Sequence, residues 1–167
     1  LVVQAQAKRY EFETDQIVTA HLPTAINRFK DEFKKLPPMT MAEMAGYPRF
    51  AGLAVTGNTT NECSECLLVA LRHPDLTAQL PQLPGGQPFG NTDGDIWNKT
   101  PDGADTVDAR EILDAWGNPI VYISSRDYRD MKKVERYMLG NGQEVKVAPA
   151  KRANGERSRR SRSWHRA

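Results

Sequence analysis

The chain has 167 residues, and its 39% hydrophobic content is enough for one domain with a single core. Its net charge of +2 is unevenly distributed. Residues 151–167 hold seven Lys or Arg and one Glu, whereas the remainder holds sixteen basic and twenty acidic residues. A mildly acidic domain therefore precedes a basic tail. None of the segments reaches the run of about 18 apolar residues that predicts a membrane span, and no signal-peptide pattern is visible.

The first predicted element is a long amphipathic helix over about residues 5–36. Apolar residues recur every three or four positions and form one stripe, made of Val18, Leu22, Ile26, Phe29, Phe33 and Leu36. Pro23 interrupts the pattern and predicts a kink or the start of a second helical segment. Pro37 and Pro38 end it. An ordinary core helix would explain the stripe, but the length predicts that the helix also projects beyond the globular part.

Two short helices are predicted next. Thr40 with Glu43, and Thr59 with Glu62, match the capping-box pattern that marks a helix start. The second of these helices should run to about Arg72, because the following histidine precedes a proline.

Cys63 and Cys66 lie three positions apart near the start of the second short helix. Three interpretations compete: a local disulfide in an exported protein, two buried thiols, or a redox or metal site. Zinc would need two more ligands, and no second Cys or His pair has the spacing of a finger. Glu62 and Glu65 would oppose formation of a thiolate. We expect the disulfide.

An acidic stretch, NTDGDIWNKTPD, lies in about thirty residues of turn-forming sequence. It places Asn91, Asp93, Asp95 and Asp102 at positions 1, 3, 5 and 12 of an EF-hand-like loop, with Asp105 and Asp108 as further oxygen donors. Position 6 departs from the pattern because it is Ile96 instead of Gly, and position 12 is Asp instead of Glu. A solvated acidic loop with Asx turns is the alternative. Asn91, Asp93, Asp95, Asp102 and Asp105 are the candidate ligands, and calcium is the candidate cofactor.

The motif DAWGNP precedes the apolar run IVYI. Its residues predict a structural elbow made of Asp114, Trp116, Gly117, Asn118 and Pro119. Gly117 can supply a positive φ, the aspartate can accept hydrogen bonds from the turn, and the proline can open a strand. We expect the strand over residues 120–123 and the tryptophan ring to be buried beside it. A β-hairpin is predicted over residues 135–147, with Gly140, Asn141 and Gly142 at its turn.

The predicted order of elements is α+β: a long N-terminal helix packed on a small antiparallel sheet, with short helices and a long acidic loop between them. The expected domain covers residues 1–150, divided into the helix, a variable region (37–108) and a sheet region (109–148). Residues 151–167 are expected to be a disordered tail.

The long helix ending in KKLPP and the later DAWGNPIVYI together resemble the major, G-type pseudopilins of type II secretion, in the type IV pilin-like superfamily. The family commonly has Tyr-Pro-Pro and Asp-Pro-Trp-Gly-Asn-Pro at these places, so Leu36 and Ala115 are departures. The resemblance covers roughly residues 1–147 and rests mainly on the elbow residues and Tyr122. It implies a non-enzymatic structural subunit of a secretion pseudopilus or a related fibre. G-type pseudopilins also bind calcium in a loop near the sheet.

The same resemblance implies partners and a location. The partners would be other copies of the chain, minor pseudopilins and inner-membrane components of the secretion system, with no small-molecule substrate. The location would be the periplasm, with anchoring in the inner membrane. The family's hydrophobic N-terminal helix and its C-terminal calcium loop are not in this sequence, so we expect the chain to begin just after that helix, and ligands from that loop cannot be carried over.

The sequence also bears on two other classes of function, an enzyme and a nucleic-acid- or anionic-surface-binding module. An enzyme is disfavoured because His21, His73 and His165 lie far apart and no nucleophile elbow or phosphate-binding loop is present. The alternative function is a nucleic-acid- or anionic-surface-binding module, which would act through the arginines of residues 151–167. A solvated, disordered tail is the favoured interpretation of those arginines.

Overall fold

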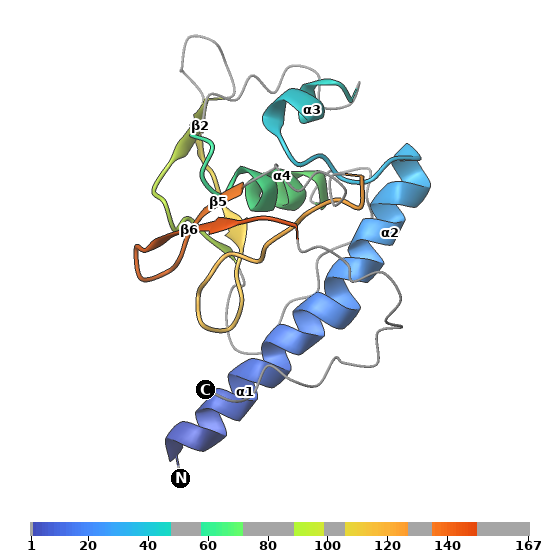
Figure 1. The fold of residues 1–167 in the computed structure, drawn as a ribbon. Helices are drawn as coiled ribbons and strands as arrows, with labels where there is room; N and C mark the ends of the chain where they lie inside the picture. The colour runs from blue at the N-terminus through green and yellow to red at the C-terminus, as the bar shows by residue number, and fades with distance from the viewer. Residues whose placement is uncertain (1, 48–57, 72–88, 99–105, 127–134, 150–167) are drawn as a thin grey trace.

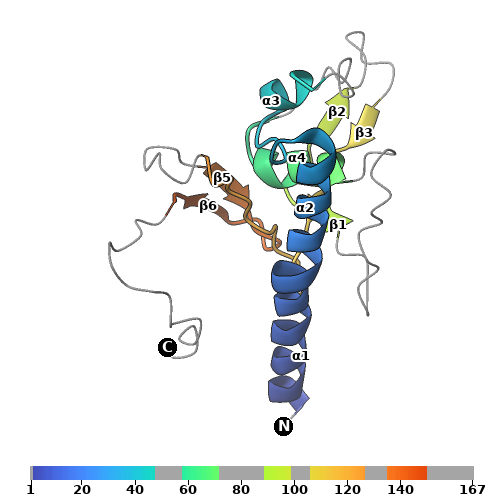
Figure 2. The same ribbon diagram turned by 90° about the vertical axis from the view of Figure 1, so that its right-hand side faces the viewer.

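The computed structural model of the chain describes residues 2–47, 58–71, 89–98, 106–126 and 135–149. The fold is α+β: a long N-terminal helix stands beside a head of short helices and antiparallel strand pairs (Figures 1 and 2). The elements are α1 (Val2–Gln16), η1 (Ile17–His21), α2 (Leu22–Phe33), α3 (Met41–Ala45), α4 (Glu62–Leu71), β1 (Phe89–Gly90), β2 (Ile96–Asn98), β3 (Thr106–Asp108), β4 (Glu111–Ile112), β5 (Glu135–Met138) and β6 (Glu144–Val147). No helix of the described residues has the length and apolar character needed to cross a membrane.

The long helix is confirmed and is continuous from Val2 to Phe33, but it changes type at η1, which is a π-helical turn. There the N–H of Leu22 donates to the carbonyl of Ile17, five residues back. Pro23, which has no N–H to donate, follows in the first turn of α2. The extra residue in the turn shifts the apolar stripe, so Ile17 is buried and Val18 is 47% exposed. The prediction that Val18 belongs to the buried stripe is wrong for this reason.

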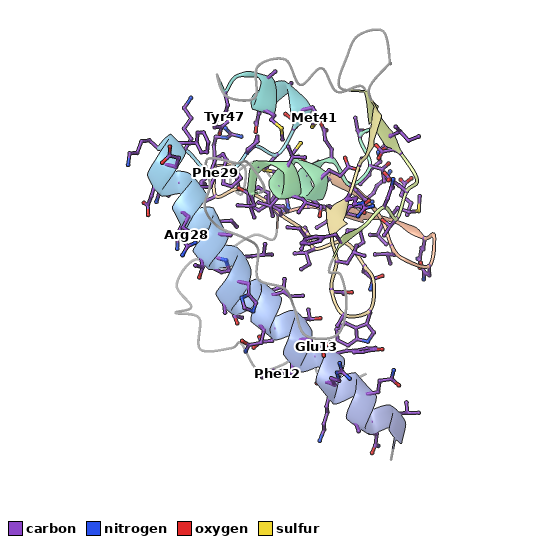
Figure 3. All side chains as sticks on the ribbon, turned by 180° about the vertical axis from the view of Figure 1, so that it is seen from behind. Phe12, Glu13, Arg28, Phe29, Met41 and Tyr47 are labelled. Carbon is purple, nitrogen blue, oxygen red and sulfur yellow. The ribbon has the colours of Figure 1, made fainter. Side chains whose placement is uncertain are left out.

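The core of the head forms around α4, which packs against α2, α3 and β4. We expected the long helix to pack on the sheet, but α2 packs against α4, and α4 also packs against β4. Phe29 of α2 is fully buried and contacts the rings of Phe33 and Tyr47 at centroid distances of 4.4 and 5.9 Å. Figure 3 shows Phe29 and Tyr47 on the head side of the helix, whereas Phe12 lies on the half that stands away from the head.

The helix starts differ from each other in how they are capped. Thr40 caps α3 as predicted, since its side chain accepts from the N–H of Glu43. The predicted box at Thr59 is not formed, because the hydroxyl of Thr59 accepts from Arg136. The side chain of Glu62 accepts from the N–H of Met41 instead of reaching back to its own helix start.

Within the described residues the strands form three separate antiparallel pairs, β1–β4, β2–β3 and β5–β6, where one sheet was expected. The predicted hairpin is confirmed as β5–β6, whose register runs from Glu135 opposite Val147 to Met138 opposite Glu144. Gly142 has a φ of 82° and closes the turn between the two strands.

The strand expected over residues 120–123 is not formed. Ile120 donates one backbone hydrogen bond to Ile112, and the chain then leaves the ladder. Side chains take the place of a partner strand: the N–H of Tyr122 donates to the hydroxyl of Tyr137, and the N–H of Ser124 donates to the sulfur of Met39. High β propensity did not produce a strand because the backbone donors were satisfied by buried side chains.

The elbow is a turn organised by Asp114, whose Oδ1 accepts from the N–H groups of Trp116 (2.9 Å) and Asn118 (2.8 Å). Gly117 has a φ of 83°. The tryptophan ring is not buried beside a strand: it is 49% exposed and meets the edge of Tyr10 on α1, with centroids 5.8 Å apart. The elbow therefore contacts the projecting helix.

Candidate metal site

Glu65 places a carboxylate in the interior of the head. It lies on α4, where eight residues are buried: Cys63, Ser64, Glu65, Cys66, Leu67, Leu68, Ala70 and Leu71. Glu65 is only 1% exposed, and its Oε1 has no hydrogen-bond partner in the part of the chain that the structure describes. A buried carboxylate oxygen without a partner is costly, so the surroundings of Glu65 require an explanation.

The turn at residues 91–95 supplies two more carboxylates. Asn91 organises this turn with both ends of its amide, because Oδ1 accepts from the N–H of Gly94 (2.7 Å) and Nδ2 donates to the carbonyl of Asp95 (2.6 Å). Gly94 has a φ of 73°, a conformation that glycine adopts without strain. Asp93 and Asp95, on either side of Gly94, are thereby held near each other.

The carboxylates of Glu65, Asp93 and Asp95 converge, with one oxygen of each lying within 4.8 Å of one of every other. Four buried oxygens in this group have no hydrogen-bond partner among the described residues: Glu65 Oε1, Asp93 Oδ1 and both oxygens of Asp95. Among the described residues, Asn58 Nδ2 donates to Asp93 Oδ2 at 3.1 Å, and hydrogen bonding from Glu65 and from the Asn58 backbone opposes the rise in the pKa of Asp95. None of the three carboxylates forms an ion pair with a described Lys, Arg or His.

A second buried carboxylate, Glu111, lies beside this cluster but is satisfied by hydrogen bonds. It accepts from Asn61 Nδ2 at 2.7 Å and from the N–H of Thr92 at 3.1 Å. Asn61 Oδ1 in turn accepts from the N–H of Met138, and the Thr92 hydroxyl donates to the Met138 carbonyl. This network joins the residue before α4 to the turn, β4 and β5, and so fixes the position of the cluster.

Burial and mutual repulsion change the acidities in the cluster. Burial, reinforced by Asp95 and Asp93, raises the pKa of Glu65 to about 10. Burial and the charge of Asp93 also raise the pKa of Asp95. Burial raises the pKa of Glu111, although hydrogen bonds from Asn61 and Thr92 oppose this effect. The group can hold a proton or a cation, but three bare negative charges in this space would repel one another.

The structure brings together only part of the predicted ligand set. Asp93 and Asp95 both belong to the cluster. The Asn91 side chain does not, because both ends of its amide form hydrogen bonds within the turn. Asp102 and Asp105 lie outside the described residues. Sequence reasoning missed Glu65 as a ligand. The sequence did contain a signal for Glu65, because it lies in the mainly apolar segment CSECLLVAL. A helix that is apolar on every side is buried, so a glutamate within it is expected in the interior of the protein.

The expected disulfide between Cys63 and Cys66 is not formed in the structure, and both thiols are buried. The two side chains face different neighbours. Cys66 contacts the sulfur of Met41 at 3.0 Å, whereas Cys63 interacts with Tyr137. Burial, with Glu62 and Glu65 nearby, raises the pKa of the Cys66 thiol, so a reactive thiolate is disfavoured.

Comparisons of the chain with protein-family models, with curated proteins and with solved structures find no significant match.

Proposed function

We propose that this chain is part of a pilin-like structural subunit, which assembles into a type II secretion pseudopilus or a related fibre. In this proposal α1 is the stalk of the subunit, and the short helices and strand pairs are its head. The proposal rests on the resemblance of the long helix and the DAWGNPIVYI segment to G-type pseudopilins. The observation that supports it best is the helix from Val2 to Phe33, of which one half packs on the head and the other half projects from it (Figures 1 and 2).

The projecting half of the helix, α1, leaves apolar side chains exposed. At a rise of 1.5 Å per residue the whole helix is about 48 Å long. Val3 and Phe12 on α1 are 79% and 64% exposed, so apolar surface remains available for neighbouring subunits. These apolar residues are scattered, so we expect the 167-residue chain to be monomeric in solution.

The elbow supports the same proposal because it contacts α1, the projecting half of the helix. Thr14 of α1 accepts a hydrogen bond from the N–H of Ala115 at 3.1 Å, and the ring of Tyr10 meets that of Trp116. The motif that carries the resemblance therefore contacts the helix that would enter the fibre.

In this proposal an apolar helix upstream of residue 1 anchors the subunit in the inner membrane and packs in the fibre, with the head in the periplasm. The partners are further copies, minor subunits and components of the secretion system. The proposal assigns the chain no catalytic role. The alternative, binding of nucleic acid or an anionic surface, depends on residues 151–167, which lie outside the described residues.

The test is fibre assembly and secretion by the full-length protein in its own cells. Deletion of the gene should abolish secretion of the exported substrates, and the wild-type gene should restore it. Phe12→Asp should prevent restoration, because it places a charge on the stalk surface that contacts neighbouring subunits.

Val121→Asp is the matched control, since Val121 is 43% exposed but belongs to the head. It should support assembly, and both variants should melt at the wild-type temperature. Unchanged secretion after gene deletion, or full assembly by Phe12→Asp, would contradict the proposal.

A further inference from the structure

We propose that Cys63 and Cys66 form a redox switch in the head. In their dithiol form they hold α4 to α3 and to β5, and oxidation of the pair to a disulfide breaks these contacts. The inference is independent of the proposed fibre function. It is drawn from the position of both thiols near the start of α4 and from the different elements that the two side chains contact.

The first argument is that each thiol is engaged with a different neighbour. The Cys66 thiol donates to the sulfur of Met41, the first residue of α3, at 3.0 Å. Cys63 interacts with the side chain of Tyr137 on β5. Both cysteines are at most 1% exposed. A disulfide has no S–H to donate, so oxidation removes the bond to Met41 and redirects both sulfurs toward each other.

The second argument is that the helix geometry does not suit a disulfide. Residues three positions apart on a helix have Cβ atoms about 5–6 Å apart. A disulfide needs its two Cβ atoms about 3.5–4.5 Å apart. Cys63 and Cys66 both lie in α4, so a bond between them requires the start of this helix to tighten or shift by roughly 1 Å.

The third argument is that the start of α4 is held by hydrogen bonds that such a shift would disturb. Asn61, the residue before the helix, donates its N–H to the carbonyl of Arg136 and accepts from the N–H of Met138, both at 2.8 Å. Glu62 Oε1 accepts from the N–H of Met41 at 2.8 Å. These bonds fix the first turn of α4 to β5 and α3, so the folded head favours the dithiol.

Oxidised glutathione is a suitable oxidant for the test. The sulfurs of Cys63 and Cys66 form one S–S bond, the S–S bond of glutathione breaks, and the two thiol protons pass to two molecules of reduced glutathione. Folding and oxidation are linked, because both act on the same chain. A fold that favours the dithiol therefore makes disulfide formation less favourable in the folded chain than in the unfolded chain.

The experiment measures this difference as an equilibrium. The 167-residue chain is equilibrated without air in mixtures of reduced and oxidised glutathione, once in buffer and once in a urea concentration that unfolds it. Free thiols are then trapped by alkylation and counted by intact mass. The equilibrium constant for disulfide formation should be about tenfold or more lower in the folded chain. Starting from both the reduced and the oxidised chain shows that equilibrium has been reached.

A second measurement locates the change within the head. Amide hydrogen exchange at Met41 and Met138 should be faster in the disulfide form, since these N–H groups donate to Glu62 and Asn61 at the start of α4. Exchange at Trp116, whose N–H donates to Asp114 in the elbow, is the internal control and should stay the same.

Met41→Leu tests the contact of Cys66 with α3, because leucine has a similar volume but no sulfur to accept the thiol proton. This variant should shift the equilibrium of the folded chain toward the disulfide and leave the unfolded chain unchanged. Met44→Leu is the matched control, since Met44 is also buried on α3, and should behave as wild type does.

Three results would overturn the proposal. Equal equilibrium constants in the folded and unfolded chain would show that the fold does not distinguish the two redox forms. A folded chain that favours the disulfide would make the bond a structural cross-link. Unchanged exchange at Met41 and Met138 in the disulfide form would show that oxidation leaves the contacts of α4 intact.

Discussion

Tyr122 is the residue at which separate segments of the head meet. Its hydroxyl donates to the carbonyl of Pro37 at 3.1 Å, just after the long helix, and its N–H donates to the hydroxyl of Tyr137 on β5 at 3.4 Å. Both tyrosines are buried, and burial is the main cause that raises the pKa of each phenol. One residue thus links three segments that lie far apart in the sequence.

Tyr122→Phe should lower the free energy of unfolding by about 1–2 kcal/mol at pH 7, because the buried Pro37 carbonyl loses its donor. The folded phenol has a raised pKa, so its stabilising effect is complete below the unfolded pKa of about 10 and is lost as the pH rises above it. The advantage of wild type over Tyr122→Phe should therefore shrink above pH 10. Urea unfolding at pH 7 and at higher pH measures both effects. An advantage that stays constant with pH would show that Tyr122 ionises equally in both states.

At the scale of elements, the elbow packs closely against the hairpin turn, and Gly117 and Gly140 lie at the point of contact. The N–H of Gly140 donates to Asn118 Oδ1 at 3.2 Å. A Cβ added at Gly140 would lie 2.4 Å from the carbonyl oxygen of Gly117, which is closer than atoms can approach. The elbow contacts α1 on its other side, so the hairpin, the elbow and the stalk form one connected unit.

Gly140→Ala should destabilise the protein by about 1–3 kcal/mol, because the added methyl group forces the hairpin turn away from the elbow. Chemical denaturation measures the loss. Gln143→Ala, in the same turn but with an exposed side chain, is the control and should change stability by no more than about 0.5 kcal/mol. Equal effects of the two substitutions would mean that the close approach of the glycines does not constrain the fold.

At the scale of the whole molecule, the two halves of the long helix lie in different environments. Its C-terminal half, α2, is part of the core, whereas α1 has a mostly exposed surface. The π-helical turn η1 lies at the boundary between them. Phe12 lies on the projecting half of the helix, and Phe29 lies on the half that is part of the core (Figure 3).

Phe29→Ala should cost about 3–5 kcal/mol of stability, because Phe29 is fully buried and contacts two aromatic rings. Phe12→Ala is the matched control on the same helix, and should stay within about 0.5 kcal/mol since its side chain is 64% exposed. Thermal or urea unfolding distinguishes the two. A large loss at Phe12 would show that the stalk is packed against something in the isolated chain.

Local sequence determined the elements whose signal lies in neighbouring residues. The amphipathic stripe gave the long helix, Pro23 marked the change of segment near η1, Thr40 capped α3, and Gly142 closed the β5–β6 hairpin. In each case the stabilising contacts lie within a few residues, so a pattern in the sequence is sufficient to predict them.

The tertiary structure alone decided the features whose partners are distant. Ile120 to Ile123 did not become a strand because buried side chains from other segments satisfied the backbone of Tyr122 and Ser124. The ring of Trp116 packs against that of Tyr10, more than a hundred residues away in the sequence, and Glu65 lies close to Asp93 and Asp95, which are also distant in the sequence. Side-chain burial and charge clustering depend on which segments the fold brings together, and the order of residues along the chain does not contain that information in a local pattern.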